Sequence, residues 1–358
     1  MEVSRRNSLS QGERVMDVLS SVGLMLLVFD FQCGVYDTHH PLRRVGSHAW
    51  DLCPSSYKLL RASMLEVDVL LTPWYTLHGT SRLDTLIRST NGFRHNVVAS
   101  HCAFHGNLPA LRVLLEKTNH KCTEANLVDW AACNGQLNVI EFLHASTTGT
   151  VRCTTWAMDI AATNGHLRVL QWLHANRSEG CTMSAVRGAA RHGHLDVLHW
   201  LHDTFHTREL WWTSAIDVAA AHGHLAVVQW LHVLRRPSSE KAWVGAAANG
   251  HLDVLQWLHA NRRAGCTTDA MDEAAANGHL DVVAWLHVNR CEGCTTAAVD
   301  GAAQRGHVDV VKYLVTHRKE GYSKASTKEA KMNGHLTVVH VLKANRQLAK
   351  QHNDCAIQ

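Results

Sequence analysis

The chain has little proline, little net charge and no long apolar run, and each shortage excludes a class of protein. Five Pro in 358 residues are too few for a linker-rich chain. A formal net charge of +4 is too small for a dedicated nucleic-acid-binding domain, which is normally strongly basic. The apolar stretch from Val22 to Phe29 ends at Asp30, well short of the ~20 residues that cross a bilayer. We therefore expect neither a nucleic-acid partner nor a membrane protein.

Targeting and catalytic signals are missing as well. Arg5 and Arg6 precede the apolar stretch, but no small-residue cleavage site follows it, so we expect no signal peptide and a cytoplasmic protein. The motifs His-Glu-x-x-His and Gly-x-Ser-x-Gly and a phosphate-binding Gly-rich loop with its Lys do not occur. The sequence thus predicts no enzymatic activity, no cofactor and no metal centre, and we expect a monomer.

A repeat of about 28 residues runs through most of the chain. Its signature is Asn277-Gly278-His279-Leu280, and closely similar strings occur at four other places. Nine glycines mark the units at intervals of 29, 30, 28, 30, 27, 28, 28 and 28 residues: Gly106, Gly135, Gly165, Gly193, Gly223, Gly250, Gly278, Gly306 and Gly334. Such a period predicts an array of stacked units that are stable only against their neighbours.

Each unit reads as two short helices. In the unit of Gly278, Thr267 or Thr268 can cap a first helix with a small apolar face, and Gly278 ends that helix in the left-handed conformation. A second helix follows from His279 or Leu280 to about Val288, with its apolar residues at helical spacing. The fold class predicted is therefore all-α.

The string Ala274 to Val283, followed by Trp285-Leu286, resembles the core of an ankyrin repeat, and the likeness covers about residues 97–349. The resemblance implies a solenoid of helix-turn-helix units that binds protein partners on its concave face, which first helices line. The usual period is 33 residues, so the shorter period here predicts that the projecting hairpins are shortened or absent. The array of about nine units occupies residues 96–349, and residues 350–358 form a polar tail.

Three polar or small residues also recur with the repeat. The Asp register (Asp129, Asp159, Asp217, Asp272 and Asp300) falls in or just after the first turn of the first helix, where a negative charge favours the helix N-terminus. The Arg register follows the second helix and suits its negative end: Arg177, Arg262, Arg290, Arg318 and Arg346. Cysteines in equivalent positions of neighbouring units lie too far apart for disulfides, so we expect reduced thiols at Cys122, Cys153, Cys181, Cys266 and Cys294.

The 28 His and 12 Trp are explained mainly by the repeat. An aromatic residue recurs on the second helix and could form a stacking platform, but we favour packing between repeats. Histidine recurs twice in each unit, eight residues apart, which is about 12 Å along a helix and too far for one zinc ion. The exception is His287, Cys291 and Cys294, which with a fourth ligand could form a zinc site; we favour a structural role for them.

Positions that vary from unit to unit are the candidates for partner binding, because the architecture does not dictate them. One first-helix register holds Trp156 in one unit and Lys241 in another. The irregular connection from Thr204 to Trp212 adds aromatic residues outside the regular stripe, and Trp and Arg are enriched at binding hot spots. The predicted partner-binding residues are Trp156, Arg187, Trp211, Trp212, Lys241 and Trp243.

Residues 1–95 contain no repeat and are predicted to form an N-terminal helical cap on the array. An alternative is an F-box-like region, since Val28-Phe29-Asp30-Phe31 and Leu42-Arg43-Arg44-Val45 with Trp50 loosely resemble that motif. The sequence therefore predicts a non-catalytic scaffold for a protein partner whose identity is open. The alternative is an F-box-type substrate adaptor of a ubiquitin ligase.

Overall fold

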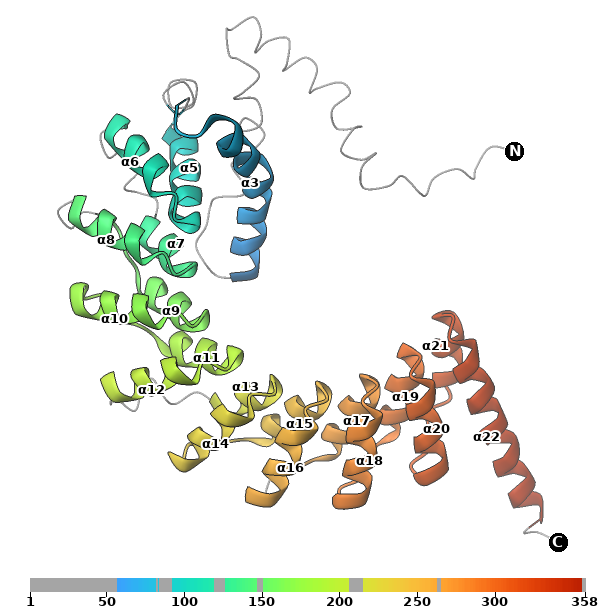
Figure 1. Cartoon of the computed structure of the whole chain (residues 1–358). Coiled ribbons are helices and arrows are strands. Elements are labelled where there is room, and N and C mark those ends of the chain that lie inside the picture. The colour runs from blue at the N-terminus through green and yellow to red at the C-terminus, as the bar shows by residue number, and fades with distance from the viewer. Residues whose placement is uncertain are drawn as a thin grey trace, which may run out of the picture. The chain divides into compact units, whose positions relative to one another are not determined.

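The computed structural model describes residues 57–81, 83, 92–118, 126–146, 151–205, 215–262 and 265–355. These parts of the chain are helices joined by short connections, and no strand occurs among them (Figure 1). The predicted all-α solenoid is therefore confirmed.

Nine pairs of helices follow one another in the described residues. The first helices of the pairs are α5 (Gly92–His105), α7 (Leu127–Cys133), α9 (Thr155–Thr163), α11 (Met183–His192), α13 (Ala215–Ala221), α15 (Glu240–Ala248), α17 (Thr268–Ala276), α19 (Thr296–Arg305) and α21 (Ser326–Met332). The second helices are α6 (Leu108–Lys117), α8 (Leu137–Ser146), α10 (Leu167–Asn176), α12 (Leu195–Thr204), α14 (Leu225–Val233), α16 (Leu252–Asn261), α18 (Leu280–Asn289), α20 (Val308–His317) and α22 (Leu336–Cys355).

Contacts divide the chain into two units, Met1–Trp156 and Ala157–Gln358. From α11 to α21, each first helix packs against the next first helix, and second helices contact one another less closely. The first helices approach one another more closely because the residues between them, Ala and Gly, are small, whereas the second helices meet through the larger Trp and His. The first helices thus form the more tightly packed layer of this unit.

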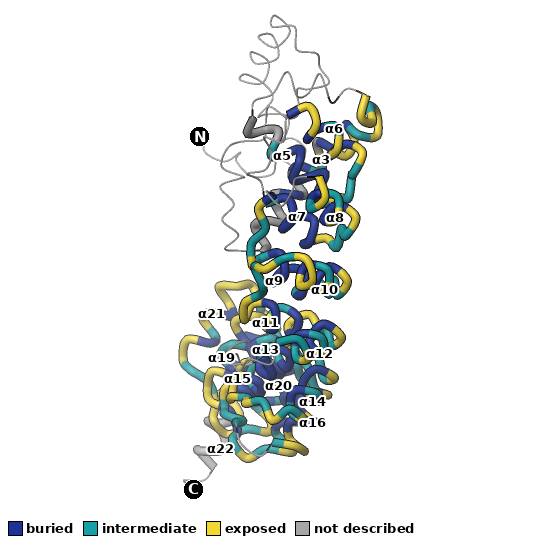
Figure 2. The backbone as a smooth tube through the Cα atoms, turned by 90° about the vertical axis from the view of Figure 1, so that its left-hand side faces the viewer, coloured by how far each residue is buried: buried dark blue, intermediate teal, exposed yellow. Residues whose placement is uncertain are grey.

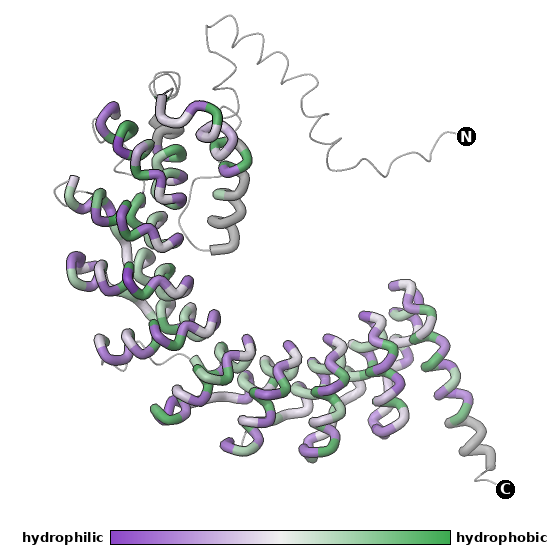
Figure 3. The backbone as a smooth tube through the Cα atoms, in the orientation of Figure 1, coloured by the Kyte–Doolittle hydropathy of each residue, from purple (hydrophilic) through white to green (hydrophobic). Residues whose placement is uncertain are grey.

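The core lies where the two layers face each other and where each pair meets its neighbours (Figure 2). In the pair α17 and α18, Ala274, Ala275, Val282 and Val283 are fully buried, and Leu286 is nearly so. Apolar and polar residues accordingly alternate along each helix (Figure 3). Helices this short are marginal alone, so their stability comes from stacking.

The helix ends agree with the predicted signals. Gly193 and Gly306 end α11 and α19 in the left-handed conformation, with φ of 76° and 84°. Thr295 caps α19 by accepting a hydrogen bond from the N–H of Ala297. Thr267 precedes α17, as predicted, but its side chain makes no capping hydrogen bond.

The connections between one pair and the next are short. No hairpin occurs in the described ones, as the short period predicts. Four of the five cysteines predicted to be reduced are free thiols, namely Cys153, Cys181, Cys266 and Cys294, and Cys122 lies outside the described residues. Burial raises the pKa of Cys181 to about 12. Among the described helices, none is long and apolar enough to cross a membrane.

The N-terminal region is described in part. Helix α3 (Tyr57–His78) packs on α5, the first helix of the first pair. The F-box-like segments and Trp50 lie outside the described residues. At the other end, α22 continues to Cys355, into the predicted polar tail.

Candidate functional site

A buried aspartate on one first helix holds the start of the next first helix. Asp272 accepts hydrogen bonds from the N–H of Thr295 (2.8 Å) and from its hydroxyl (2.6 Å). The same hydroxyl oxygen accepts the N–H of Ala297 and so caps α19. We call this contact the aspartate bridge. It recurs at Asp129–Thr154, Asp159–Thr182 and Asp217–Ser239.

The bridge corrects the role expected for these aspartates. We expected Asp272 to act on the N-terminus of its own helix, but its bonds go to the next repeat, and its side chain is buried. Burial raises the pKa of Asp159 and Asp272, and the hydrogen bonds from Thr182 and Thr295 oppose that rise. Each bridge therefore joins two repeats at the cost of burying a carboxylate.

Four of the nine units depart from this pattern. The position that Asp takes elsewhere is occupied by Ser100, Arg187, Val244 and Lys328. The residue that a bridge from 244 would reach is Thr267, whose hydroxyl is buried and has no hydrogen-bond partner among the described residues. The residues that a bridge from 187 would reach lie outside the described part of the chain.

A second contact between repeats joins a glycine to a histidine. A Cβ atom on Gly278 would lie 2.5 Å from Nδ1 of His307, so only glycine leaves room for that ring. His279 of the preceding unit donates from Nε2 to the carbonyl of Ala248 (3.1 Å). This geometry explains why glycine and histidine are adjacent in the signature, because the glycine of one unit receives the histidine of the next.

In five units, the second histidine meets an aromatic ring of the next unit. His259 packs edge-to-face on Trp285, with ring centroids 5.5 Å apart, and His287 packs likewise on Tyr313 at 6.0 Å. Equivalent contacts occur at His174–Trp200, His202–Trp230 and His232–Trp257. The packing role predicted for the aromatic register is thus confirmed for these pairs.

Three members of the Arg register form ion pairs with glutamates two residues further on, whereas Arg262 donates to the Ser238 hydroxyl and the Arg236 carbonyl. Arg290 donates to both carboxylate oxygens of Glu292, and Arg177 and Arg318 contact their glutamates in the same way: Arg177–Glu179 and Arg318–Glu320. Burial raises the pKa of Glu292, but the Arg290 bonds outweigh it, so the pKa is lowered overall. These pairs fix the connections that lead to the next repeat.

The first helices carry exposed side chains that none of these contacts uses. Lys241 is exposed on α15, and Ser184 and Asp269 are exposed at the equivalent positions of α11 and α17. Arg187 is exposed on α11. The layer of first helices therefore exposes different side chains at equivalent positions of neighbouring repeats.

Trp156 is half-buried at the end of a row of aromatic rings in the first unit. Phe104 packs edge-to-face on Trp130 at 6.2 Å, and Trp130 packs on Trp156 at 6.4 Å. Trp130 is buried, whereas Phe104 and Trp156 keep part of their surface exposed. The row can present aromatic surface to a partner while its centre stays packed.

The other predicted tryptophans differ from Trp156. Trp243 is 1% exposed and lies under the guanidinium of Arg290, 4.9 Å from the ring centroid. It has no surface to offer, so we leave it out of the surface proposed below. Trp211 and Trp212 lie outside the described residues.

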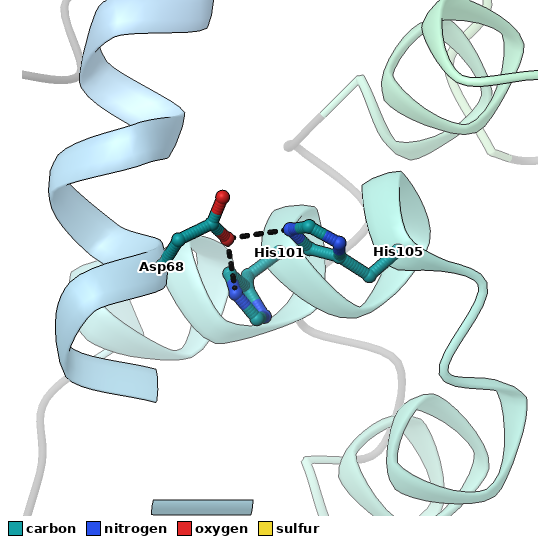
Figure 4. A group of neighbouring side chains, drawn as sticks. All are labelled: Asp68, His101 and His105. Atoms are coloured by element: carbon teal, nitrogen blue, oxygen red, sulfur yellow. Dashed lines mark hydrogen bonds and ion pairs between the residues drawn. The ribbon is translucent and has the colours of Figure 1, made fainter. Parts of the chain in front are cut away.

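A cluster of two histidines and one aspartate lies between α3 and α5 (Figure 4). Nε2 of His101 lies 2.9 Å from Oδ1 of Asp68, and Nε2 of His105 lies 2.5 Å from the same oxygen. His101 is 3% exposed, Asp68 23% and His105 36%. The cluster is thus buried at one end and open at the other.

Sequence reasoning missed this cluster. The spacing of His101 and His105, four residues apart in one helix, was a signal that both rings share a face. Asp68 lies more than thirty residues away on another helix, so nothing in the sequence pattern joins it to them. In the described part of the chain, the predicted alternative of His287, Cys291 and Cys294 does not converge on one point.

Comparison with known families identifies the repeats. A family model for ankyrin repeats in many copies matches residues 158–202 and 189–232. A model for three copies of the ankyrin repeat matches residues 243–325. None of the curated proteins compared with the chain matches it.

Proposed function

Because this chain is an ankyrin-repeat protein, and ankyrin repeats are general modules for protein–protein interaction, we propose that it is a non-catalytic scaffold that binds a protein partner on its layer of first helices. The observation that carries the proposal is that the side chains which join the repeats differ from those which the first helices expose. Aspartate bridges, glycine–histidine contacts and histidine–aromatic contacts repeat from unit to unit. Exposed first-helix residues differ between units and take no part in them.

A frame of this kind favours binding because it is already ordered. Several repeats are fixed to the next by hydrogen bonds to a buried carboxylate, by packed rings or by both, so little side-chain or backbone entropy is lost on association. Affinity then depends on a few side chains presented together. Trp156, Arg187 and Lys241 are the described candidates, and Trp211 and Trp212 are candidates from sequence alone.

The test compares first-helix variants with matched variants on the second helices. A partner is first captured by proximity labelling with the full chain in its native cell and then titrated in purified form. Arg187→Ala and Lys241→Ala remove exposed cations from α11 and α15, and Trp156→Ala shortens the aromatic row. The control variants Arg168→Ala and Lys312→Ala remove exposed cations from α10 and α20.

We expect at least one first-helix variant to weaken binding by more than about 1 kcal/mol, the usual threshold for a hot spot, while helical circular dichroism is unchanged. The control variants should bind as the wild type does. Normal binding by all three first-helix variants would place the site elsewhere. Recovery of a ubiquitin ligase scaffold in the same labelling experiment would favour the alternative, a substrate adaptor.

A further inference from the structure

We propose that Asp68, His101 and His105 bind a Zn²⁺ ion that fastens helix α3 to the first repeat. The three side chains come from two helices that pack together, α3 and α5, and their ligand atoms all lie within 4.8 Å of one another. Figure 4 shows both imidazole rings turned toward one carboxylate oxygen. A zinc ion at that point would be held by both helices at once.

The ligand atoms are close to the arrangement that zinc requires. Four-coordinate zinc has bonds of about 2.0–2.2 Å to nitrogen and oxygen, so neighbouring ligand atoms are about 3.3–3.5 Å apart. The separations here are 2.9 Å for His101 Nε2 and 2.5 Å for His105 Nε2, both to Oδ1 of Asp68. A shift of the Asp68 carboxylate by less than about 1 Å makes room for the ion, and such a shift needs only side-chain rotation.

The surroundings hold the inner ligand in place. His101 is buried, and the ring of Tyr75 is stacked against it with centroids 5.8 Å apart. The Tyr75 hydroxyl is itself hydrogen-bonded to the Cys102 sulfur at 3.0 Å. Asp68 and His105 are partly exposed, so an ion can enter from solvent and keep water as its fourth ligand.

The donor set selects the metal. Two imidazole nitrogens and one carboxylate oxygen suit zinc and other first-row transition metals, whereas calcium and magnesium require oxygen ligands.

The surroundings of His101 Nδ1 determine how tightly we expect the site to bind zinc. Nδ1 of His101 is buried and has no hydrogen-bond partner among the described residues. Most zinc-bound histidines donate their second N–H to an acceptor, and losing that acceptor weakens metal binding about 10–100-fold. We therefore expect a micromolar site, strong enough to fasten α3 but reversible.

The experiment titrates metal-free full-length protein with Zn²⁺ by calorimetry and with Co²⁺ by visible absorption. The test variants are Asp68→Asn, which keeps the shape of the side chain, and His105→Gln, at the exposed end of the cluster. The chain has 28 His, so weak binding elsewhere needs its own control. His192→Ala serves for that, because His192 is exposed and its ring is stacked on His194, without a carboxylate in that pair.

We expect the protein to bind one equivalent of Zn²⁺ and the Co²⁺ form to show the visible absorption of a tetrahedral site. Amide exchange in α3 should be slower when zinc is present. Asp68→Asn and His105→Gln should each weaken the site at least 10-fold with unchanged helical circular dichroism, and His192→Ala should leave it intact. Equal binding by Asp68→Asn and wild type, or no saturable binding at tens of micromolar Zn²⁺, would overturn the proposal. The cluster would then be a hydrogen-bonded aspartate with two histidines and no metal.

Discussion

Replacing Val244 by Asp should supply the aspartate bridge that the pair α15 and α17 lacks. Asp occupies this position in five units, whereas half-buried Val244 occupies it here. In the part of the chain that the structure describes, the buried hydroxyl of Thr267 then has no hydrogen-bond partner. In the next unit, Asp272 reaches Thr295 at 2.8 Å and 2.6 Å. Val244→Asp should therefore place its carboxylate on the N–H and hydroxyl of Thr267.

The expected gain is a difference between opposing contributions. Each hydrogen bond to a charged group contributes about 1.5–3 kcal/mol. Burial of the new carboxylate and loss of the valine methyl groups together destabilise the folded state by about 2–4 kcal/mol. The raised pKa values of Asp159 and Asp272 show that this burial opposes ionisation. We expect a net stabilisation of about 1 kcal/mol, and the reverse change, Asp272→Ala, should cost about 2–3 kcal/mol because it removes two hydrogen bonds to a charged group.

The measurement must be local as well as global, because a repeat array does not unfold in one step along its whole length. Urea unfolding followed by circular dichroism gives the overall change. Amide exchange in α17 reports the interface itself. Thr267→Ala, alone and combined with Val244→Asp, completes a double-mutant cycle with an expected coupling of at least about 0.5 kcal/mol. If Val244→Asp changes stability equally with and without the Thr267 hydroxyl, the assigned function of the bridge is refuted.

Two further predictions concern histidine. Gly278→Ala should destabilise the array by about 2–4 kcal/mol, since φ is +85° there and the new Cβ would meet His307. The loss of stability should be smaller when His307→Ala is also present. Urea melts of the two single variants and the double variant measure these free energies of unfolding. Burial lowers the pKa values of His194, His251 and His307. The unfolded chain then binds protons more readily below about pH 6.5, so the urea midpoint should be lower at pH 5.5 than at pH 7.5. Glutamates with lowered pKa, such as Glu292, lose their stabilising effect only below pH 4.5, so equal midpoints would exclude a histidine contribution.

What the sequence predicted was local structure with a strong periodic signal. The period located the units, the left-handed glycines ended the first helices, and the short spacing predicted connections without hairpins. These features follow from residues within a few positions of one another. Backbone conformation and helix periodicity are sufficient to predict them.

What the sequence did not predict was which residues meet across the repeat boundary. Asp272 was placed correctly on its helix but assigned to the wrong partner, because a charge near a helix start has a familiar local explanation. The partner, Thr295, is 23 residues away and is a common capping residue in its own right. The cluster of Asp68 with His101 and His105 is a stronger case, since α3 has no repeat register with which to align it.

Units that lack a recurring residue indicate which positions serve a purpose other than the contact between repeats. A residue that recurs in nearly every unit, such as the histidine that packs over a glycine, is explained by the contact between units. A unit that lacks such a residue loses a contact, and it persists only if packing compensates or the position has another role. Val244 fits the first case, because its apolar side chain is half-buried. Arg187 fits the second, because it is an exposed cation at a position where four other units bury an aspartate. Binding is the function that such a side chain can serve, which is why Arg187 ranks first among the positions to be substituted.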